Sequence, residues 1–126
     1  MKHNRLVDHI TLRVKNLEKS KEFYRVLAET LGHTLSQEGK DQFYVDGLLF
    51  TQNPEATGSV HMSFEAPNPQ LVKMFHQSAL QKGCQCLSAP EDTCNAFNEY
   101  RAIVLDPDGN NVEVAYKAKR ISNSVM

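Results

Sequence analysis

Hydrophobic positions along the chain follow two different periods, which predict short strands separated by two amphipathic helices. Residues 7–14 alternate with period two, with apolar residues on one face and polar residues, His9 among them, on the other. From residue 17 to residue 31 the apolar positions recur at four-residue steps, and Gly32 is a natural residue for the helix end. Asn16 is a favourable cap at the helix start. The chain therefore opens with a predicted strand and a predicted helix.

The remaining elements are predicted from short apolar runs and from turn sequences. Further strands are expected at about 33–38, 42–46, 48–52, 59–65, 84–88, 100–105 and 111–117, and a second helix at about 69–82. Asp46-Gly47 is typical of a tight turn between two paired strands, and Asp108-Gly109 joins the last two strands. The order strand, helix and three strands thus occurs twice.

This order reflects an internal duplication. A shift of 52 residues superposes His9 on His61, and in the last hairpin a shift of 62 residues superposes Thr51 on Glu113. The ten extra residues fit at about 89–98, an irregular loop of the kind where function is often located. We therefore expect one α+β domain of residues 1–126, built from two β-α-β-β-β modules at about 5–53 and 58–117, with a short tail after them.

Composition excludes several classes of protein. The 126 residues carry 14 Lys and Arg against 15 Asp and Glu, and a net charge of -1 argues against a partner that is a nucleic acid. No apolar run is long enough to cross a membrane, and the start of the chain lacks the apolar core of a signal peptide, so a cytoplasmic location is expected. Three cysteines without a C-x-x-C pair favour packing roles over a disulfide framework or a zinc site.

Two histidines and one glutamate are the candidate metal ligands. His9 and His61 occupy the same position on the first strand of each module, and Glu113 lies on the polar face of the last strand. If the modules pack about a pseudo-two-fold axis, the three side chains converge on one concave sheet. Imidazole and carboxylate bind divalent ions and leave positions open for water or substrate. The alternative for each residue is a solvated or hydrogen-bonded side chain on a half-buried strand.

The segments DHITLRV, HMSFEA and LDPDGNNVEV, in this duplicated order, resemble those of the vicinal oxygen chelate superfamily and of its small glyoxalase-like members. The resemblance implies a curved mixed β-sheet around a central cavity, built from the two modules. It implies that His9, His61 and Glu113 bind a divalent metal ion, namely zinc, manganese, nickel or iron, and that Glu113 is also catalytic.

The sequence departs from the four-ligand members of that superfamily. Their fourth ligand falls near Thr51, and threonine is a poor ligand, so the set of three agrees better with the fosfomycin-resistance and dioxygenase branches. Thr51, Arg13, Tyr100 and Arg101 are the candidates for substrate contact, and the register of the strand decides whether Tyr100 or Arg101 faces the cavity.

The resemblance implies one of two functions. The first is a metal-dependent enzyme of the lyase, isomerase or transferase type, acting on a small substrate that chelates the metal through adjacent oxygens. The second is a metal-free protein that sequesters a small molecule, like the bleomycin-resistance proteins. Small members of the superfamily commonly form homodimers, and the sequence leaves open whether the site lies within one chain or is shared by two.

Overall fold

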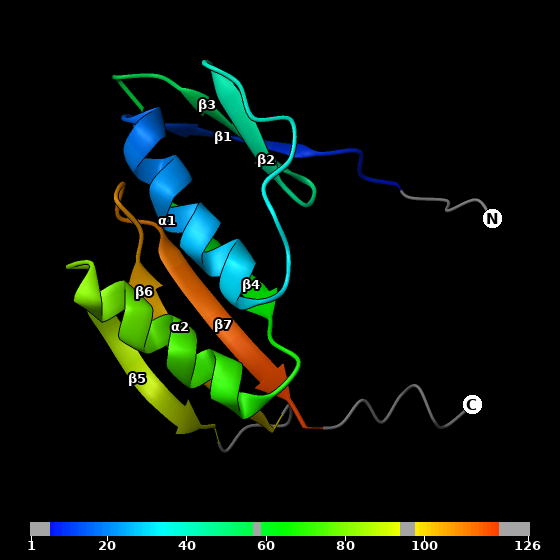
Figure 1. The fold of residues 1–126 in the computed structure, drawn as a ribbon, viewed down its shortest axis with the longest axis vertical. Coiled ribbons are helices and arrows are strands. Elements are labelled where there is room, and N and C mark those ends of the chain that lie inside the picture. Colours follow the sequence, from blue (N-terminus) through cyan, green and yellow to red (C-terminus); the bar gives the residue numbers. More distant parts are fainter. Residues whose placement is uncertain (1–5, 57–58, 94–97, 119–126) are drawn as a thin grey trace.

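The structure, a computed structural model, describes residues 6–56, 59–93 and 98–118 (Figure 1). Seven strands and two helices follow the predicted order within these residues. They are β1 (Ile10–Val14), α1 (Leu17–Thr30), β2 (Gln42–Val45), β3 (Leu48–Gln52), β4 (His61–Glu65), α2 (Pro69–Gln81), β5 (Cys86–Asp92), β6 (Glu99–Leu105) and β7 (Asn111–Lys117). Neither helix has the length and apolar character that crossing a membrane requires, as far as the described residues go.

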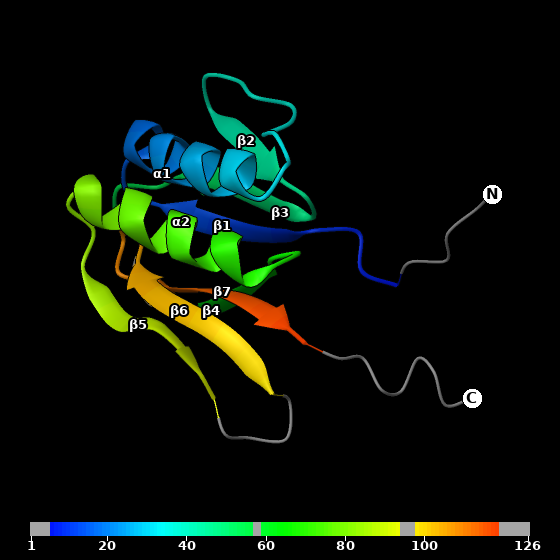
Figure 2. The ribbon, with the colours of Figure 1, turned by 60° about the horizontal axis from the view of Figure 1, so that its bottom comes forward.

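The strands form two sheets, one for each module (Figure 2). The first sheet has the order β1-β3-β2 and the second the order β4-β7-β6-β5. In both sheets the first strand of the module pairs in parallel with the last strand and forms an edge. The expected α+β class is confirmed, and hydrogen bonding divides the strands between two mixed sheets instead of one continuous sheet.

Both helices begin and end at the residues that the sequence favours. The side chains of Asn16 and Asn68 accept hydrogen bonds from the third backbone N–H of each helix, which would otherwise lack a partner. Gly32 and Gly83 follow the ends of α1 and α2 with positive φ angles of 87° and 88°, a conformation that favours glycine. The two helices are thus capped in the same way, and they run side by side against the sheets (Figure 1).

The apolar faces of the helices and sheets meet in one core. Tyr24 of α1 lies at its centre, with its ring centroid 4.5 Å from that of Phe50 on β3. Phe50 stacks in turn on Phe43 of β2 at 4.8 Å, and all three side chains are fully buried. Such aromatic pairs add to the free energy gained from burial alone. Phe75 of α2 extends this core into the second module, 6.1 Å from Phe23.

The predicted strands differ from those observed mainly at three places. The first strand begins at Ile10, because the partner strand starts at Leu48 and offers nothing for earlier residues to pair with. The strand expected at 33–38 is reduced to one bridge between Ser36 and Tyr44. Conversely, β5 continues to Asp92 into the predicted loop at 89–98, and residues 94–97 of that loop lie outside the described residues.

Candidate functional site

The open face of the second sheet carries a row of polar side chains from β4 and β7. The parallel register pairs Ser63 with Glu113 and His61 with Asn111, so that these four side chains point to the same face. Their neighbours in sequence point to the opposite face, where Val112 and other apolar residues are buried against the helices. The alternation of the sequence thus places polar chemistry on one face and the core on the other.

His61 and Glu113 meet on this open face. Nε2 of His61 lies 2.8 Å from Oε1 of Glu113, within hydrogen-bonding distance. The side chain of Glu113 is 11% exposed and that of His61 is 49% exposed, so the pair lies at the surface of the sheet with the carboxylate beneath the imidazole. This contact brings together two of the three predicted metal ligands.

Arg101 of β6 approaches the other oxygen of the same carboxylate. Antiparallel pairing places Ile103 opposite Glu113 and Arg101 opposite Ala115, so Arg101 shares the open face. Its Nε lies 3.9 Å from Oε2 of Glu113, and one of its terminal nitrogens donates to Oγ of Ser88 at 3.4 Å. Glu113 is therefore flanked by an imidazole on one oxygen and by a guanidinium group on the other.

Tyr100 points away from this cluster. It precedes Arg101 on the same strand, so its side chain lies on the opposite face of the sheet. There it packs against the core, with Nζ of Lys73 5.9 Å from the centroid of its ring. The register that the sequence left open thus places Arg101, and not Tyr100, beside Glu113.

His9 does not join His61 and Glu113 within this chain. It lies one residue before β1 in the first sheet, where Nδ1 is 2.9 Å from a carboxylate oxygen of Asp8 and the ring is 6.2 Å from that of Tyr44. Among the described residues no three His, Cys, Asp or Glu side chains are close enough to bind one metal ion. The metal-ligand role of the three residues stays a prediction.

Arg13 and Thr51 lie together on the open face of the first sheet, since the parallel register of β1 and β3 pairs them directly. This register also corrects the alignment of the two modules. Thr11 corresponds to Ser63 by the shift of 52 residues, and it pairs with Leu49, as Ser63 pairs with Glu113. Leu49 is therefore the structural equivalent of Glu113. Since leucine offers no donor atom, a fourth ligand is lacking at this position.

A hydrogen-bonded hairpin aligns the two strands that carry His61 and Glu113. Oδ1 of Asp106 accepts from the backbone N–H groups of Asp108 and Asn110, and Oδ2 accepts from the Asn110 side chain, all at 2.9 Å. Oδ1 of Asn110 accepts in turn from the N–H of Val60, directly before β4. The hairpin sequence thus fixes the start of β7 against the start of β4.

Ser88 was not predicted as a site residue, because the register of β5 shifts on both sides of it. A strand with such irregularities does not keep the simple alternation from which faces are assigned in a sequence. In the sequence, the only sign of its role was a polar residue within the predicted strand at 84–88.

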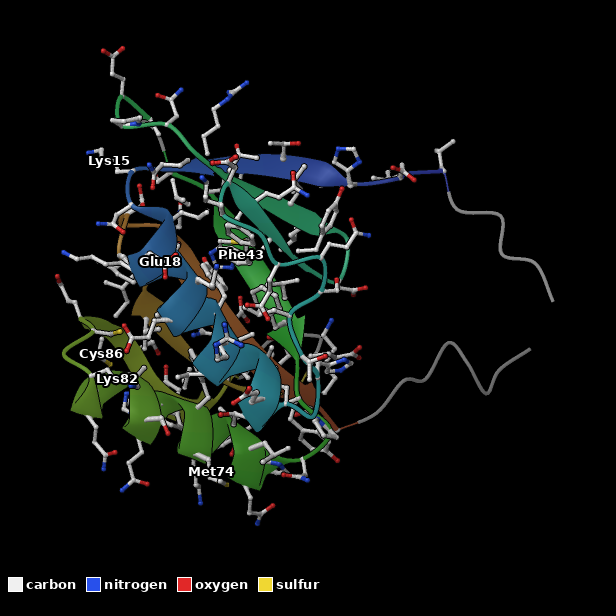
Figure 3. All side chains as sticks on the ribbon, turned by 45° about the horizontal axis from the view of Figure 1, so that its top comes forward. Lys15, Glu18, Phe43, Met74, Lys82 and Cys86 are labelled. Atoms are coloured by element: carbon white, nitrogen blue, oxygen red, sulfur yellow. The ribbon has the colours of Figure 1, made fainter. Side chains whose placement is uncertain are left out.

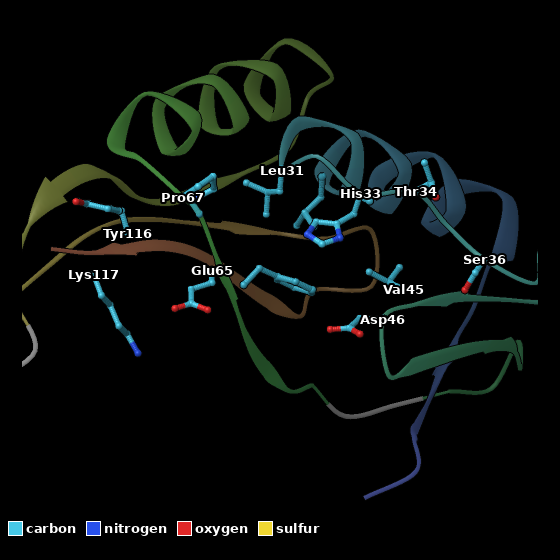
Figure 4. Close-up of a pocket in the computed structure, with 14 residues that line it drawn as sticks. Leu31, His33, Thr34, Ser36, Val45, Asp46, Glu65, Pro67, Tyr116 and Lys117 are labelled. Atoms are coloured by element: carbon cyan, nitrogen blue, oxygen red, sulfur yellow. The ribbon is translucent and has the colours of Figure 1, made fainter. Parts of the chain in front are cut away.

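A cavity of about 710 Å³ lies between the modules at the far end of β4 (Figure 4). It is bordered by the end of α1, the segment that follows it, the turn between β2 and β3 and the ends of β4 and β7. Its polar lining includes His33, Asp46, Glu65 and Lys117. None of the predicted site residues lines this cavity, so the cavity and the His61–Glu113 pair are separate features of the surface.

Comparison with known proteins identifies the family. The sequence profile of the Glyoxalase/Bleomycin resistance protein/Dioxygenase superfamily matches residues 6–114. The chain belongs to this superfamily. No curated protein matches the sequence.

Solved structures of this superfamily show the same fold. A glyoxalase/bleomycin resistance protein from Albidiferax ferrireducens T118 is 26% identical, with a TM-score of 0.71 over 90% of this chain and 100% of that one. A proposed glyoxalase from Bacillus halodurans is 22% identical, with a TM-score of 0.72 over 88% of this chain and 95% of that one. A superfamily enzyme from Burkholderia phytofirmans PsJN is 15% identical, with a TM-score of 0.67 over 88% and 98% of the two chains.

Proposed function

We propose that this superfamily member is a divalent-metal-dependent enzyme whose metal is held by His61 and Glu113. The observation that carries the proposal is the distance of 2.8 Å between Nε2 of His61 and Oε1 of Glu113 on an open sheet face. Two donor atoms this close can bind one ion in place of their mutual hydrogen bond. A nitrogen and an oxygen donor together suit zinc, manganese, nickel or iron.

The third ligand in this proposal is His9 of a second copy in a homodimer. β1 and β4 are both edge strands of their sheets, and the shift of 52 residues relates their histidines: His9 lies directly before β1 and His61 is the first residue of β4. Leu6, Val7 and Ile10 are 98%, 58% and 53% exposed, which is unusual for three apolar side chains so close in sequence. A two-fold axis that pairs β1 with β4 of the second copy would cover this segment and bring the two histidines together.

The chemistry that we assign to the site follows from the charges of the metal ion, Arg101 and Glu113. When bound, the metal would supply Lewis-acid stabilisation of an oxyanion or enolate formed from a substrate with adjacent oxygens. Arg101 holds Oε2 of Glu113 and offers its remaining N–H groups to an anionic part of the substrate. Arg13 and Thr51 would line the opposite wall of a site shared between two copies, as further substrate contacts. Glu113 is the proposed catalytic carboxylate.

Metal content tests the proposal directly. The chain is purified without a histidine tag, refolded with each of the four metals, and measured by elemental analysis. We expect about one equivalent of metal per chain for the wild type and a loss of binding in His61→Ala. His33→Ala is the matched control, because it removes a histidine outside the pair. Binding below about a tenth of an equivalent with every metal would overturn the proposal.

Mixing two defective chains tests whether the site is shared. His9→Ala and His61→Ala each lack one ligand, but a mixed dimer contains one complete set, with His61 and Glu113 from one copy and His9 from the other. Random exchange of copies should restore about a quarter of the wild-type metal content. A site within a single chain would give no recovery on mixing.

A metal-free binding protein is the second candidate, and the cavity of about 710 Å³ between the modules favours it, since this volume is ordinary for a small-molecule site. Thermal denaturation in EDTA with a panel of bulky ligands separates the two functions. Stabilisation by a ligand without metal, together with no metal binding by the wild type, would favour sequestration.

A further inference from the structure

A histidine and a cysteine are paired on the face of the second sheet that lies opposite the His61–Glu113 pair. Nε2 of His76, on α2, is 3.2 Å from Sγ of Cys86, the first residue of β5. Cys86 pairs with the buried Val104, which places its side chain on the side covered by the helix. Figure 3 shows Cys86 at the end of the molecule where α2 ends.

A small reagent can reach this pair from solvent. Within the described part of the chain β5 is an edge strand, paired on one side only, and both Cys86 and His76 are half-buried. The sulfur is therefore close to the surface, although the helix covers one side of it.

The imidazole gives Cys86 a proton acceptor at hydrogen-bonding distance. The thiolate, and not the thiol, is the nucleophile in cysteine chemistry, and an adjacent histidine base is a common means of generating it. Cys84 provides a contrast within the same chain. Burial raises the pKa of the Cys84 thiol, and the negative charge of Asp106 raises it further, so that less of this thiol is ionised near neutral pH.

We propose that Cys86 is a nucleophilic thiol, activated by His76, that reacts with hydrogen peroxide as a reversible modification site. The imidazole takes the thiol proton, and the thiolate sulfur attacks one peroxide oxygen. The S–O bond forms as the O–O bond breaks, and the hydroxide that leaves takes the proton from the imidazolium as water. The sulfur is oxidised to a sulfenic acid and the peroxide is reduced. A low-molecular-weight thiol then displaces a second water and forms a mixed disulfide.

The two described cysteines of one folded chain provide the comparison. Cys94→Ser is used as the background, so that only Cys84 and Cys86 remain. The chain is treated with iodoacetamide, or with hydrogen peroxide and dimedone, and the label on each cysteine is followed by mass spectrometry. We expect Cys86 to react about 10-fold faster than Cys84, and the two rates to become similar when the chain is unfolded in urea.

Substitution of the histidine separates activation from simple exposure. His76→Asn keeps a polar side chain of similar size but removes the base, and it should lower the ratio of the two rates several-fold, whereas the control His33→Asn should not change it. Equal rates in the folded wild type, or a ratio that His76→Asn leaves unchanged, would overturn the proposal. The comparison of the two rates in buffer and in urea can overturn the proposal even if His76→Asn fails to fold.

Discussion

The hydroxyl of Tyr24 donates a hydrogen bond of 2.6 Å to Oδ2 of Asp106, and this contact joins the helix of the first module to the closing hairpin of the second. Both side chains are buried, Tyr24 completely and Asp106 to all but 5% of its surface. The same carboxylate organises the hairpin through the backbone of Asn110. The contact therefore connects the aromatic core to the segment that aligns the His61–Glu113 pair.

Tyr24→Phe tests the weight of this hydrogen bond. The variant keeps the ring in the core but deprives a buried carboxylate of one partner, so we expect the free energy of unfolding to fall by about 1.5–3 kcal/mol. Urea denaturation followed by circular dichroism measures the change. Tyr116→Phe is the control, because it removes the hydroxyl of a half-buried tyrosine outside this pair. A loss of the same size in both variants would contradict the expectation.

Alkaline pH provides a second test of the same pair. Burial raises the pKa of Tyr24 well above its ordinary value of 10.0, and the charge of Asp106 and their hydrogen bond raise it further. The folded state thus binds the phenolic proton more tightly than the unfolded state. This contribution to stability is complete below about pH 10 and is lost as the pH rises from there towards the folded pKa.

The difference in unfolding free energy between the wild type and Tyr24→Phe should therefore shrink above about pH 10, because only the wild type loses this contribution. Urea denaturation of both proteins between about pH 8 and about pH 11 measures it. The other titrating groups are common to both proteins and cancel in the difference. Parallel stability curves over this range would show that the proton of Tyr24 is not linked to folding.

Most of the fold could be predicted from the sequence, because its signals are local. The alternation around His61 and the four-residue steps of both helices required only the period of apolar residues, and the predicted cap Asn16 acts within one helical turn. The prediction of a strand at 33–38 was largely wrong. Only Ser36 forms a bridge, to Tyr44 of β2, because little of β2 lies beside this segment. Strand length is set by the partner, and the partner is not visible in a local pattern.

The site could be predicted only in part. The faces of β4 and β7 followed from alternation, which placed His61 and Glu113 on one side, but their separation of 2.8 Å depends on the register of two strands 50 residues apart in sequence. The choice between Tyr100 and Arg101 depended in the same way on the pairing of β6 with β7. The alignment of the two modules matched Thr51 with Glu113, whereas the strand pairing makes Leu49 its equivalent. A sequence alignment does not show which residues of two neighbouring strands are paired.

Two turns share the sequence Asp-Gly, but substitution of the glycine by alanine should affect their stability differently. Gly109 has a φ of +90°, a conformation that a side chain strains, so Gly109→Ala should lower the free energy of unfolding by about 1–2 kcal/mol. In the equivalent turn it is Asp46 that has the positive φ. Among the described residues, a methyl group on Gly47 would meet only the backbone oxygen of Asp8, at 4.0 Å. Gly47→Ala should therefore cost much less. Equal losses in thermal denaturation would contradict this assignment of strain.

If β1 pairs with a second copy in the proposed homodimer, individual backbone N–H groups of β1 should have different roles. The N–H of Ile10 donates to the carbonyl oxygen of Gly47 at 3.0 Å, so it points towards β3. Because alternate residues of a parallel strand bond to opposite sides, the N–H of Thr11 points to the free edge of β1. Proline lacks this N–H and is tolerated at the edge of a sheet. Thr11→Pro should therefore leave the fold of the chain intact but remove a hydrogen bond on which pairing with β4 of a second copy depends.

We expect Thr11→Pro to shift the protein from dimer to monomer in sedimentation equilibrium, with a circular dichroism spectrum like that of the wild type. Ile10→Pro is the matched control: it removes the N–H bonded to Gly47, so it should destabilise the chain itself. Metal content measured on the same samples connects assembly to chemistry, because a monomer keeps His61 and Glu113 but lacks His9 of a second copy. A Thr11→Pro protein that stays dimeric would place the interface elsewhere than at β1.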